Sequence, residues 1–89
     1  MYDLTLNPQT QRVYNRLYGA DFERLDTALE SLKTNPRPRG TKKLTGNIFR
    51  IRIGDWRIIY SINDKDRLIT IGKIARRSED TYNGVKDLF

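Results

Sequence analysis

The sequence contains no cysteine and no histidine. Disulfide bonds, thiolate nucleophiles and imidazole acid–base catalysis are therefore excluded, as are most zinc sites. Long apolar runs are also missing, and the N-terminal stretch MYDLTLNPQT lacks a basic segment followed by an apolar one. Neither a membrane span nor an export signal is expected, so the sequence predicts a cytoplasmic protein. It also predicts no metal and no cofactor.

Acidic residues are scarce in the second half of the chain. From Arg37 to Arg77 there are twelve Lys or Arg residues against three Asp, a local net charge of +9. The rest of the chain holds five basic and eight acidic residues, net −3, in agreement with the overall +6. A surface that only keeps a protein in solution usually mixes both signs. The imbalance favours a polyanionic partner, nucleic acid first, because counterion release from phosphates drives binding.

At 89 residues the chain is long enough for one domain, residues 1–89, with one modest core. Its first half predicts a short strand over residues 2–6 and then two antiparallel helices. Asn7 and Pro8 are typical of an N-cap and a first helical position, and Gly19 is typical of a helix end. Asp21 is expected to cap the second helix. The apolar face of that helix consists of Phe22, Leu25, Leu29 and Leu32.

Residues 35–43, NPRPRGTKK, contain two prolines and a glycine and are predicted to form a basic loop. Three strands follow, over residues 48–53, 56–62 and 68–75, with Phe49 and Trp56 on the apolar face. Strict alternation in the third strand would bury Lys73, and a bulge at Gly72-Lys73 avoids this and returns the next apolar residue to the core. Ser78 is expected to begin a short last helix.

The predicted fold class is therefore α+β. An N-terminal strand and a helical hairpin precede a three-stranded antiparallel meander that completes one sheet, and a short C-terminal helix ends the chain. Helices on one side of such a sheet leave its other side uncovered.

Arginines are predicted to gather on that uncovered side. Arg50 and Arg52 lie two residues apart on one strand, about 7 Å from each other, and Arg57 faces the same way across the turn. With the bulge Arg77 joins them, and without it Arg76 does. Guanidinium groups hold phosphate with two hydrogen bonds and can stabilise the charge that develops when a phosphodiester is cleaved. The plainer interpretation is that these are ordinary polar residues on a solvated face.

Tyr82 has two interpretations that the sequence leaves open. It can stack on a nucleic-acid base, or it can anchor the last helix to the sheet. The remaining cations are expected to make general phosphate contacts; they are Arg37, Arg39, Lys42, Lys43 and Lys73.

The stretch KLTGNIFRIRIGDWRIIYSIND, the strand end KIARR and then Tyr82 resemble the RelE branch of the RelE/ParE toxin superfamily of type II toxin–antitoxin systems. The resemblance implies a ribosome-dependent endoribonuclease that cuts messenger RNA in the aminoacyl site. It also implies a RelB-like antitoxin partner, acidic in character, whose helices wrap the toxin.

In this resemblance Arg50 and Arg52 match the paired basic strand positions, and Arg57 matches the arginine after the hairpin aromatic. The late arginine is Arg77 if the strand end IARR is aligned, or Arg76 if six residues are counted back from the matching tyrosine, Tyr82. The best-known members carry lysines at the paired positions. A guanidinium has a pKa above about 12 and is a poor general base. Catalysis would then depend on charge stabilisation and in-line geometry, with the 2′-oxygen attacking phosphorus to leave a 2′,3′-cyclic phosphate.

Two other functions remain open. The ParE-like branch of the same superfamily resembles this chain but poisons DNA gyrase, and a gyrase-binding surface has no need of a clustered phosphate site. A non-catalytic RNA-binding module is the third interpretation.

Overall fold

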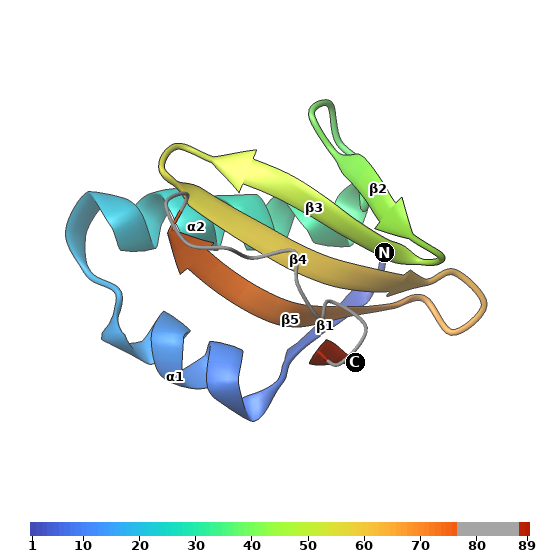
Figure 1. The fold of residues 1–89 in the computed structure, drawn as a ribbon, viewed down its shortest axis with the longest axis horizontal. Coiled ribbons are helices and arrows are strands. Elements are labelled where there is room, and N and C mark those ends of the chain that lie inside the picture. The colour runs from blue at the N-terminus through green and yellow to red at the C-terminus, as the bar shows by residue number, and fades with distance from the viewer. Residues whose placement is uncertain (77–87) are drawn as a thin grey trace.

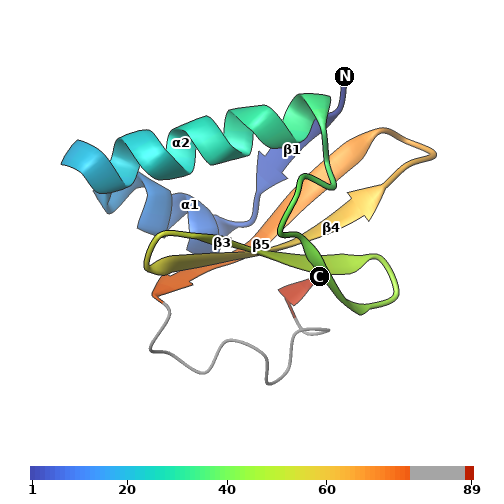
Figure 2. The ribbon, with the colours of Figure 1, turned by 90° about the horizontal axis from the view of Figure 1, so that it is seen from above.

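The computed structural model describes residues 1–76 and 88–89. In chain order its elements are β1 (Asp3–Leu6), α1 (Pro8–Arg16), α2 (Gly19–Thr34), β2 (Lys42–Thr45), β3 (Ile48–Ile53), β4 (Trp56–Asn63) and β5 (Leu68–Arg76). The strands form one five-stranded sheet in the order β1-β5-β4-β3-β2, in which β1 runs parallel to β5 and the other pairs are antiparallel. Both helices cover the same face of this sheet (Figures 1 and 2).

The predicted α+β architecture is confirmed, with one strand more than expected. The meander has four strands, because the end of the predicted basic loop forms β2, where Lys42 pairs with Arg50. Pro36 and Pro38, which indicated a loop, both lie before this strand. Every residue of β2 therefore keeps a backbone N–H group that can pair in the sheet. The predicted C-terminal helix beginning at Ser78 lies outside the described residues.

The start of α1 follows the prediction. The Asn7 side chain accepts a hydrogen bond from the Thr10 N–H at 2.8 Å, and Pro8 occupies the first helical position. The same Asn7 side chain donates to the Gly72 carbonyl at 2.9 Å. This cap therefore both starts the helix and fastens it to β5.

The predicted boundary between the helices was wrong. α1 ends at Arg16, and α2 begins at Gly19 with Tyr18 as its N-cap, so Asp21 lies in the first turn and does not cap the helix. Gly19 has φ 61°. This left-handed conformation is accessible to glycine at little cost, so the glycine turns the chain into the second helix instead of ending the first.

The core lies between the helices and the sheet. Leu25, Leu29 and Leu32 of α2 are buried against the apolar face of the strands, and Phe49 and Trp56 are each 8% exposed, as predicted. Tyr60 is fully buried, and its hydroxyl donates to the Pro36 carbonyl at 2.8 Å. Its apolar ring fills the core, while its hydroxyl holds the loop that leads into β2.

The predicted bulge in β5 is confirmed. Tyr60 pairs with Ile71 and Ile59 pairs with Lys73, so Gly72 has no partner on β4. The extra residue returns Ile74 to the core side, where it is buried. The bulge thus decides which side chains at the end of β5 face the helices.

Candidate nucleic-acid interface

The sheet brings cations from four strands onto its helix-free face. Arg52 of β3 lies directly opposite Arg57 of β4, and Arg50 occupies the neighbouring row, in register with Ile59 and Lys73 on one side and Lys42 on the other. Partners in register point to the same face of a sheet. The cationic face, as the name is used below, consists of Lys42, Arg50, Arg52, Arg57 and Lys73. Figure 2 shows that both helices lie on the opposite side of the sheet.

Like-charged residues occupy neighbouring positions on this face. Cβ atoms of directly opposed residues are about 5 Å apart, and residues two apart on a strand are separated by about 7 Å. Two unit charges at about 5 Å repel by about 1 kcal/mol in bulk water and by roughly 3 kcal/mol near a protein surface. An anion bound between the Arg52 and Arg57 guanidinium groups would turn this repulsion into attraction.

Two arginines of the cationic face, Arg50 and Arg52, form no ion pair with a carboxylate of the described residues. The ion pairs within residues 1–76 and 88–89 join Lys33 to Glu30, Arg37 to Asp64 and Arg76 to Asp21, so none involves Arg50 or Arg52. Arg50 is half-buried, and its Nε has no hydrogen-bond partner in the part of the chain that the structure describes. A buried cationic donor without an acceptor is costly, and a phosphate oxygen would satisfy it.

Arg76 does not belong to the cationic face. It pairs with Trp56 in the β4–β5 ladder, on the side of the helices. Its guanidinium carbon lies 4.6 Å from the centroid of the Trp56 ring, and its Nη2 is 3.8 Å from an Asp21 carboxylate oxygen. The bulge at Gly72 is the reason, because it shifts the alternation of every residue that follows.

Arg37 is also turned away from this face. Its guanidinium makes two hydrogen bonds to Asp64, at 2.9 and 3.3 Å, and lies 5.1 Å from the centroid of the core ring of Phe49. The Tyr2 hydroxyl donates to the same Asp64 carboxylate at 2.5 Å. The pKa of Asp64 lies below its ordinary value, mainly because Arg37 hydrogen bonds to it and then because Tyr2 does. This cluster ties the loop after α2 to the β4–β5 turn, which is a structural role.

The other residues predicted to contact phosphate do not all lie on the cationic face. Lys42 and Lys73 lie on the cationic face, whereas Lys43 pairs with Phe49 and points to the other side. Arg39 is exposed in the loop before β2. Arg77 and Tyr82 lie outside the described residues. The bulge, with which Arg77 instead of Arg76 was expected to join the cluster, is present.

Two features of this face were not predicted from the sequence. Ile59 belongs to it by register but is fully buried, and the ring of Phe89 lies against Gly72 of the bulge. A Cβ placed on Gly72 would come within 2.4 Å of that ring. The isoleucine in the sequence RII was the available signal for an apolar centre on this face.

No helix in the described ranges is long and apolar enough to span a bilayer. Within the same ranges, no three His, Cys, Asp or Glu side chains are grouped so that they could hold a metal ion.

A mixed sheet with a helical hairpin on one face and a row of cations on the other defines a small basic α+β domain. Residues 4–81 match the sequence profile of the family described as "ParE toxin of type II toxin-antitoxin system, parDE". The chain belongs to this family, within the RelE/ParE toxin superfamily.

Relatives of the chain carry RelE names. It is 38% identical over 81 residues to a Methanocaldococcus jannaschii protein named "Putative toxin RelE1", a match that covers 85% of this chain and 90% of the relative. The archaeal RelE–RelB complex of Pyrococcus horikoshii contains a chain that is 30% identical, with a TM-score of 0.75, and the match covers 88% of this chain and 97% of that one. The isolated RelE toxin of E. coli is 16% identical with a TM-score of 0.77 over all of both chains, which shows a shared fold.

Proposed function

We propose that this protein is a RelE-like toxin that cuts ribosome-bound messenger RNA on its cationic face and so inhibits translation. The observation that carries the proposal is the placement of Arg52 opposite Arg57 with Arg50 in the next row, where Arg50 and Arg52 have no carboxylate partner among the described residues. Three permanent positive charges on adjacent strands can each hold phosphate oxygens through guanidinium hydrogen bonds.

The proposed reaction needs charge stabilisation more than proton transfer by a side chain. The ribose 2′-oxygen forms a bond to the adjacent phosphorus, the bond from phosphorus to the 5′-oxygen breaks, and the products are a 2′,3′-cyclic phosphate and a 5′-hydroxyl. The 2′-proton passes to solvent, and the leaving 5′-oxygen takes a proton from solvent. Arg50, Arg52 and Arg57 neutralise the charge that builds on the phosphate oxygens. Arg77 and Tyr82 are expected to complete the site, the first on the phosphate and the second on a base.

The proposed partner is a RelB-like antitoxin of acidic character. The names of the Pyrococcus horikoshii complex and of the Mycobacterium tuberculosis RelBE2 complex pair a RelE-type toxin with its antitoxin. The cationic face is attractive to an acidic protein for the same electrostatic reason that it attracts RNA.

The test is a cell-free translation extract in which message cleavage is mapped by primer extension. The unmodified protein is expected to stop translation and to cut message only when ribosomes are present. Arg57→Ala and Arg52→Ala should each lower the cleavage rate by about 100-fold or more, the scale seen when one charge-stabilising group is removed. Arg12→Ala, which removes an exposed arginine of α1, is the matched control and should cut normally. Message that is bound but never cut would identify a binding module instead.

A second candidate function follows from the family match itself. The matching profile is that of ParE toxins, and the ParE-like branch is the one expected to act on DNA gyrase. A supercoiling assay with purified gyrase separates the two functions. Inhibition of supercoiling without cleavage of message would replace the nuclease proposal.

A further inference from the structure

The helix-free face also has an apolar zone, which lies along β5. In the register of the sheet, Arg50 of β3 lies beside Ile59 of β4, and Arg57 of β4 lies beside Ala75 of β5. Ile59 is fully buried and Ala75 is 4% exposed, and the described core cluster under the helices contains neither of them. The arginines therefore gather towards β3, and apolar side chains gather towards β5. The apolar zone, as the name is used below, consists of Ile59, Gly72, Ala75 and Phe89.

The ring of Phe89 is the part of this zone that solvent reaches. Phe89 is 44% exposed, whereas the other three members are buried. A Cβ atom built on Gly72 would lie 2.4 Å from Cζ of this ring, 2.8 Å from Cε1 and 3.0 Å from Cε2. If the glycine met the ring at its edge, both Cε atoms would lie much farther away than Cζ. One face of the ring therefore covers Gly72, and the other face is turned away from the sheet.

Glycine at position 72 is what lets the ring lie so close to the strand. Any side chain at this position would overlap the ring, because its Cβ would lie only 2.4 Å from Cζ. Glycine inside a strand often marks a place where another group approaches the backbone closely. The C-terminus lies on the side of the sheet away from the helices (Figure 2). The ring is therefore on the same face as the arginines proposed to hold phosphate.

We propose that the apolar zone is a nucleobase subsite, in which a base of single-stranded RNA stacks on the outer face of the Phe89 ring. The arginines of the cationic face hold the phosphates beside that base. Proteins commonly bind single-stranded RNA through a basic groove that follows the backbone and aromatic side chains that carry the bases. The RNA then has a defined direction across the sheet, with its backbone over β3 and β4 and its bases towards β5. In taking RNA as the ligand, the inference rests on the proposed function.

The subsite is expected to distinguish bases by size and not by hydrogen bonding. The side chains of Ile59, Ala75 and Phe89 carry no donor or acceptor, and Gly72 has no side chain. Stacking accepts every base, and preferences arise from stacking strength. A purine, which has the larger ring system, should therefore bind more tightly here than a pyrimidine.

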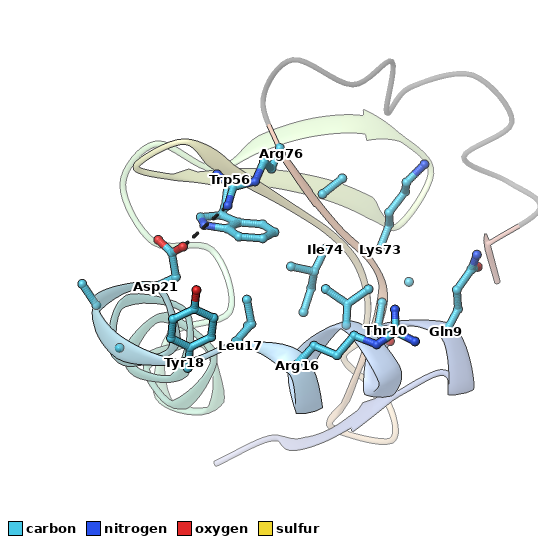
Figure 3. A pocket seen from close by; sticks show the side chains of 15 residues that line it. Gln9, Thr10, Arg16, Leu17, Tyr18, Asp21, Trp56, Lys73, Ile74 and Arg76 are labelled. Carbon is cyan, nitrogen blue, oxygen red and sulfur yellow. Dashed lines mark ion pairs between the residues drawn. The ribbon is translucent and has the colours of Figure 1, made fainter.

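A pocket on the other side of the sheet is less suited to RNA. It lies between α1, the start of α2 and the end of β5, and it has a volume of about 710 Å³ (Figure 3). Its lining includes Trp56, Arg76 and the carboxylate of Asp21. That carboxylate lies 3.8 Å from the Arg76 guanidinium and repels a phosphate. Because Trp56 lies on the helix side and Phe89 on the other, Trp56 reports whether RNA binds away from the proposed subsite.

The first experiment measures RNA affinity by fluorescence anisotropy. The probes are labelled 2′-O-methyl oligoadenylate and oligouridylate, which cannot be cut because the attacking oxygen is blocked. Phe89→Ala should weaken binding of the adenylate tenfold or more and should reduce the preference for adenylate over uridylate. Phe89→Tyr should bind like the unmodified protein, because its ring also stacks. Tyr18→Ala, which removes an 85% exposed ring on the helix side, is the matched control and should bind normally.

Phe89→Leu separates stacking from packing. Leucine keeps an apolar side chain against Gly72 but has no aromatic face, so this variant should bind as weakly as Phe89→Ala. Urea unfolding of both variants identifies any loss of binding that comes from a loss of folding. Binding by Phe89→Leu at the level of the unmodified protein would show that the side chain only packs on the strand, and would overturn the inference.

Stacking is observed directly in Phe89→Trp, which places an indole ring at Gly72 and keeps an aromatic face. Stacking of a base quenches indole emission, so oligoadenylate should quench this variant more than the unmodified protein, whose only tryptophan is Trp56. Equal quenching in the two proteins would place the RNA near Trp56 and would contradict the proposed subsite.

Two other results would also overturn the inference. Tighter binding of RNA by Phe89→Ala would mean that the ring occupies the place of the base instead of carrying it. A polyglutamate peptide that displaces the RNA, and that itself binds tenfold more weakly to Phe89→Ala, would make the apolar zone a protein contact.

Message cleavage in the translation extract distinguishes this inference from the proposed function. RNA binding that depends on Phe89, without any cleavage by the unmodified protein, contradicts the nuclease proposal and leaves the subsite. Cleavage by the unmodified protein, with RNA binding that is the same in Phe89→Ala, contradicts the inference alone. Cleavage together with binding that depends on Phe89 supports both.

Discussion

Arg52 and Arg57 occupy directly opposed positions on β3 and β4, so that their side chains leave the sheet side by side on the helix-free face. Two arginines away from this face have partners within the described chain: Arg37 meets Asp64, and Arg76 lies over Trp56. A like-charged cross-strand pair lowers stability, whereas an opposite pair raises it. Because Arg50 and Arg52 have no carboxylate partner among the described residues, this row of cations suits an anionic ligand.

Arg52→Glu is expected to separate stability from activity. The substitution turns the like-charged pair with Arg57 into an opposite one, which should raise the free energy of unfolding by about 0.5 to 1.5 kcal/mol. Cleavage should fall by about 100-fold or more, because the new carboxylate repels phosphate. Urea unfolding and primer extension measure the two effects, and Arg52→Gln should fall between the wild type and the glutamate variant in stability. A stable Arg52→Glu protein that still cuts at the normal rate would remove the cationic face from the mechanism.

The contact between Tyr14 and Asp26 predicts a loss of stability at high pH. Tyr14 of α1 donates a hydrogen bond to the Asp26 carboxylate of α2, which raises the pKa of Tyr14 to about 12. The unfolded chain releases this proton near pH 10, so the stabilisation is complete below pH 10 and is lost as pH rises towards 12.

Urea unfolding between pH 8 and 12 measures this loss. Tyr14→Phe should lower the free energy of unfolding by about 1 kcal/mol at neutral pH, and the difference from wild type should shrink above pH 10. Tyr18→Phe, at an 85% exposed position, should follow the wild type. A Tyr14→Phe difference that is the same at pH 8 and pH 12 would show that the hydrogen bond does not control this titration.

The alternation of apolar and polar residues predicted most of the sheet, because β3 and β4 are regular strands in which successive side chains point to opposite faces. The bulge was also predictable, since burial of Lys73 without it would be costly. The helix boundary was not predictable, because Gly19 is compatible with ending one helix or starting the next; in the structure it has φ 61° and begins α2. β2 was not predicted, because the prolines before it indicated a loop. Its four residues form a strand by pairing with β3, which the local sequence does not show.

The candidate site shows the same division. Residues on regular strands, Arg50, Arg52 and Arg57, could be placed from the sequence. The placement of Arg76 depended on the predicted bulge, which moves this residue off the cationic face. The pocket between α1 and β5 had no signal in the sequence, because it arises where β1 stops short of the end of β5.

Gly72→Ala is expected to disturb the contact with Phe89. The added Cβ would lie 2.4 Å from the ring, so either the ring or the bulge must move. Phe89 is the last residue and is 44% exposed, so its ring can turn aside, and the cost should stay near the low end of overpacking, about 1 kcal/mol. In a Phe89→Ala background the same substitution should cost clearly less, and a double-mutant cycle by urea unfolding gives the coupling. Equal costs in both backgrounds would show that the ring is not what excludes a side chain at this position.

Neighbouring lysines of β2 give the sharpest test of which face binds RNA. Lys42 points to the cationic face, in register with Arg50, whereas Lys43 is in register with Phe49 and points to the opposite side. Both are exposed lysines on one short strand, so their substitutions change net charge equally.

For single-stranded RNA each phosphate contact contributes about 0.7 to the slope of log affinity against log salt concentration. Lys42→Ala should therefore reduce the slope by about 0.7, and Lys43→Ala should leave it nearly unchanged. Fluorescence anisotropy with a labelled oligonucleotide between 50 and 200 mM salt, roughly the range over which such contacts are well resolved, measures both slopes. Equal reductions would mean that RNA is attracted by overall charge and not held on this face, since only a directional contact distinguishes two adjacent lysines.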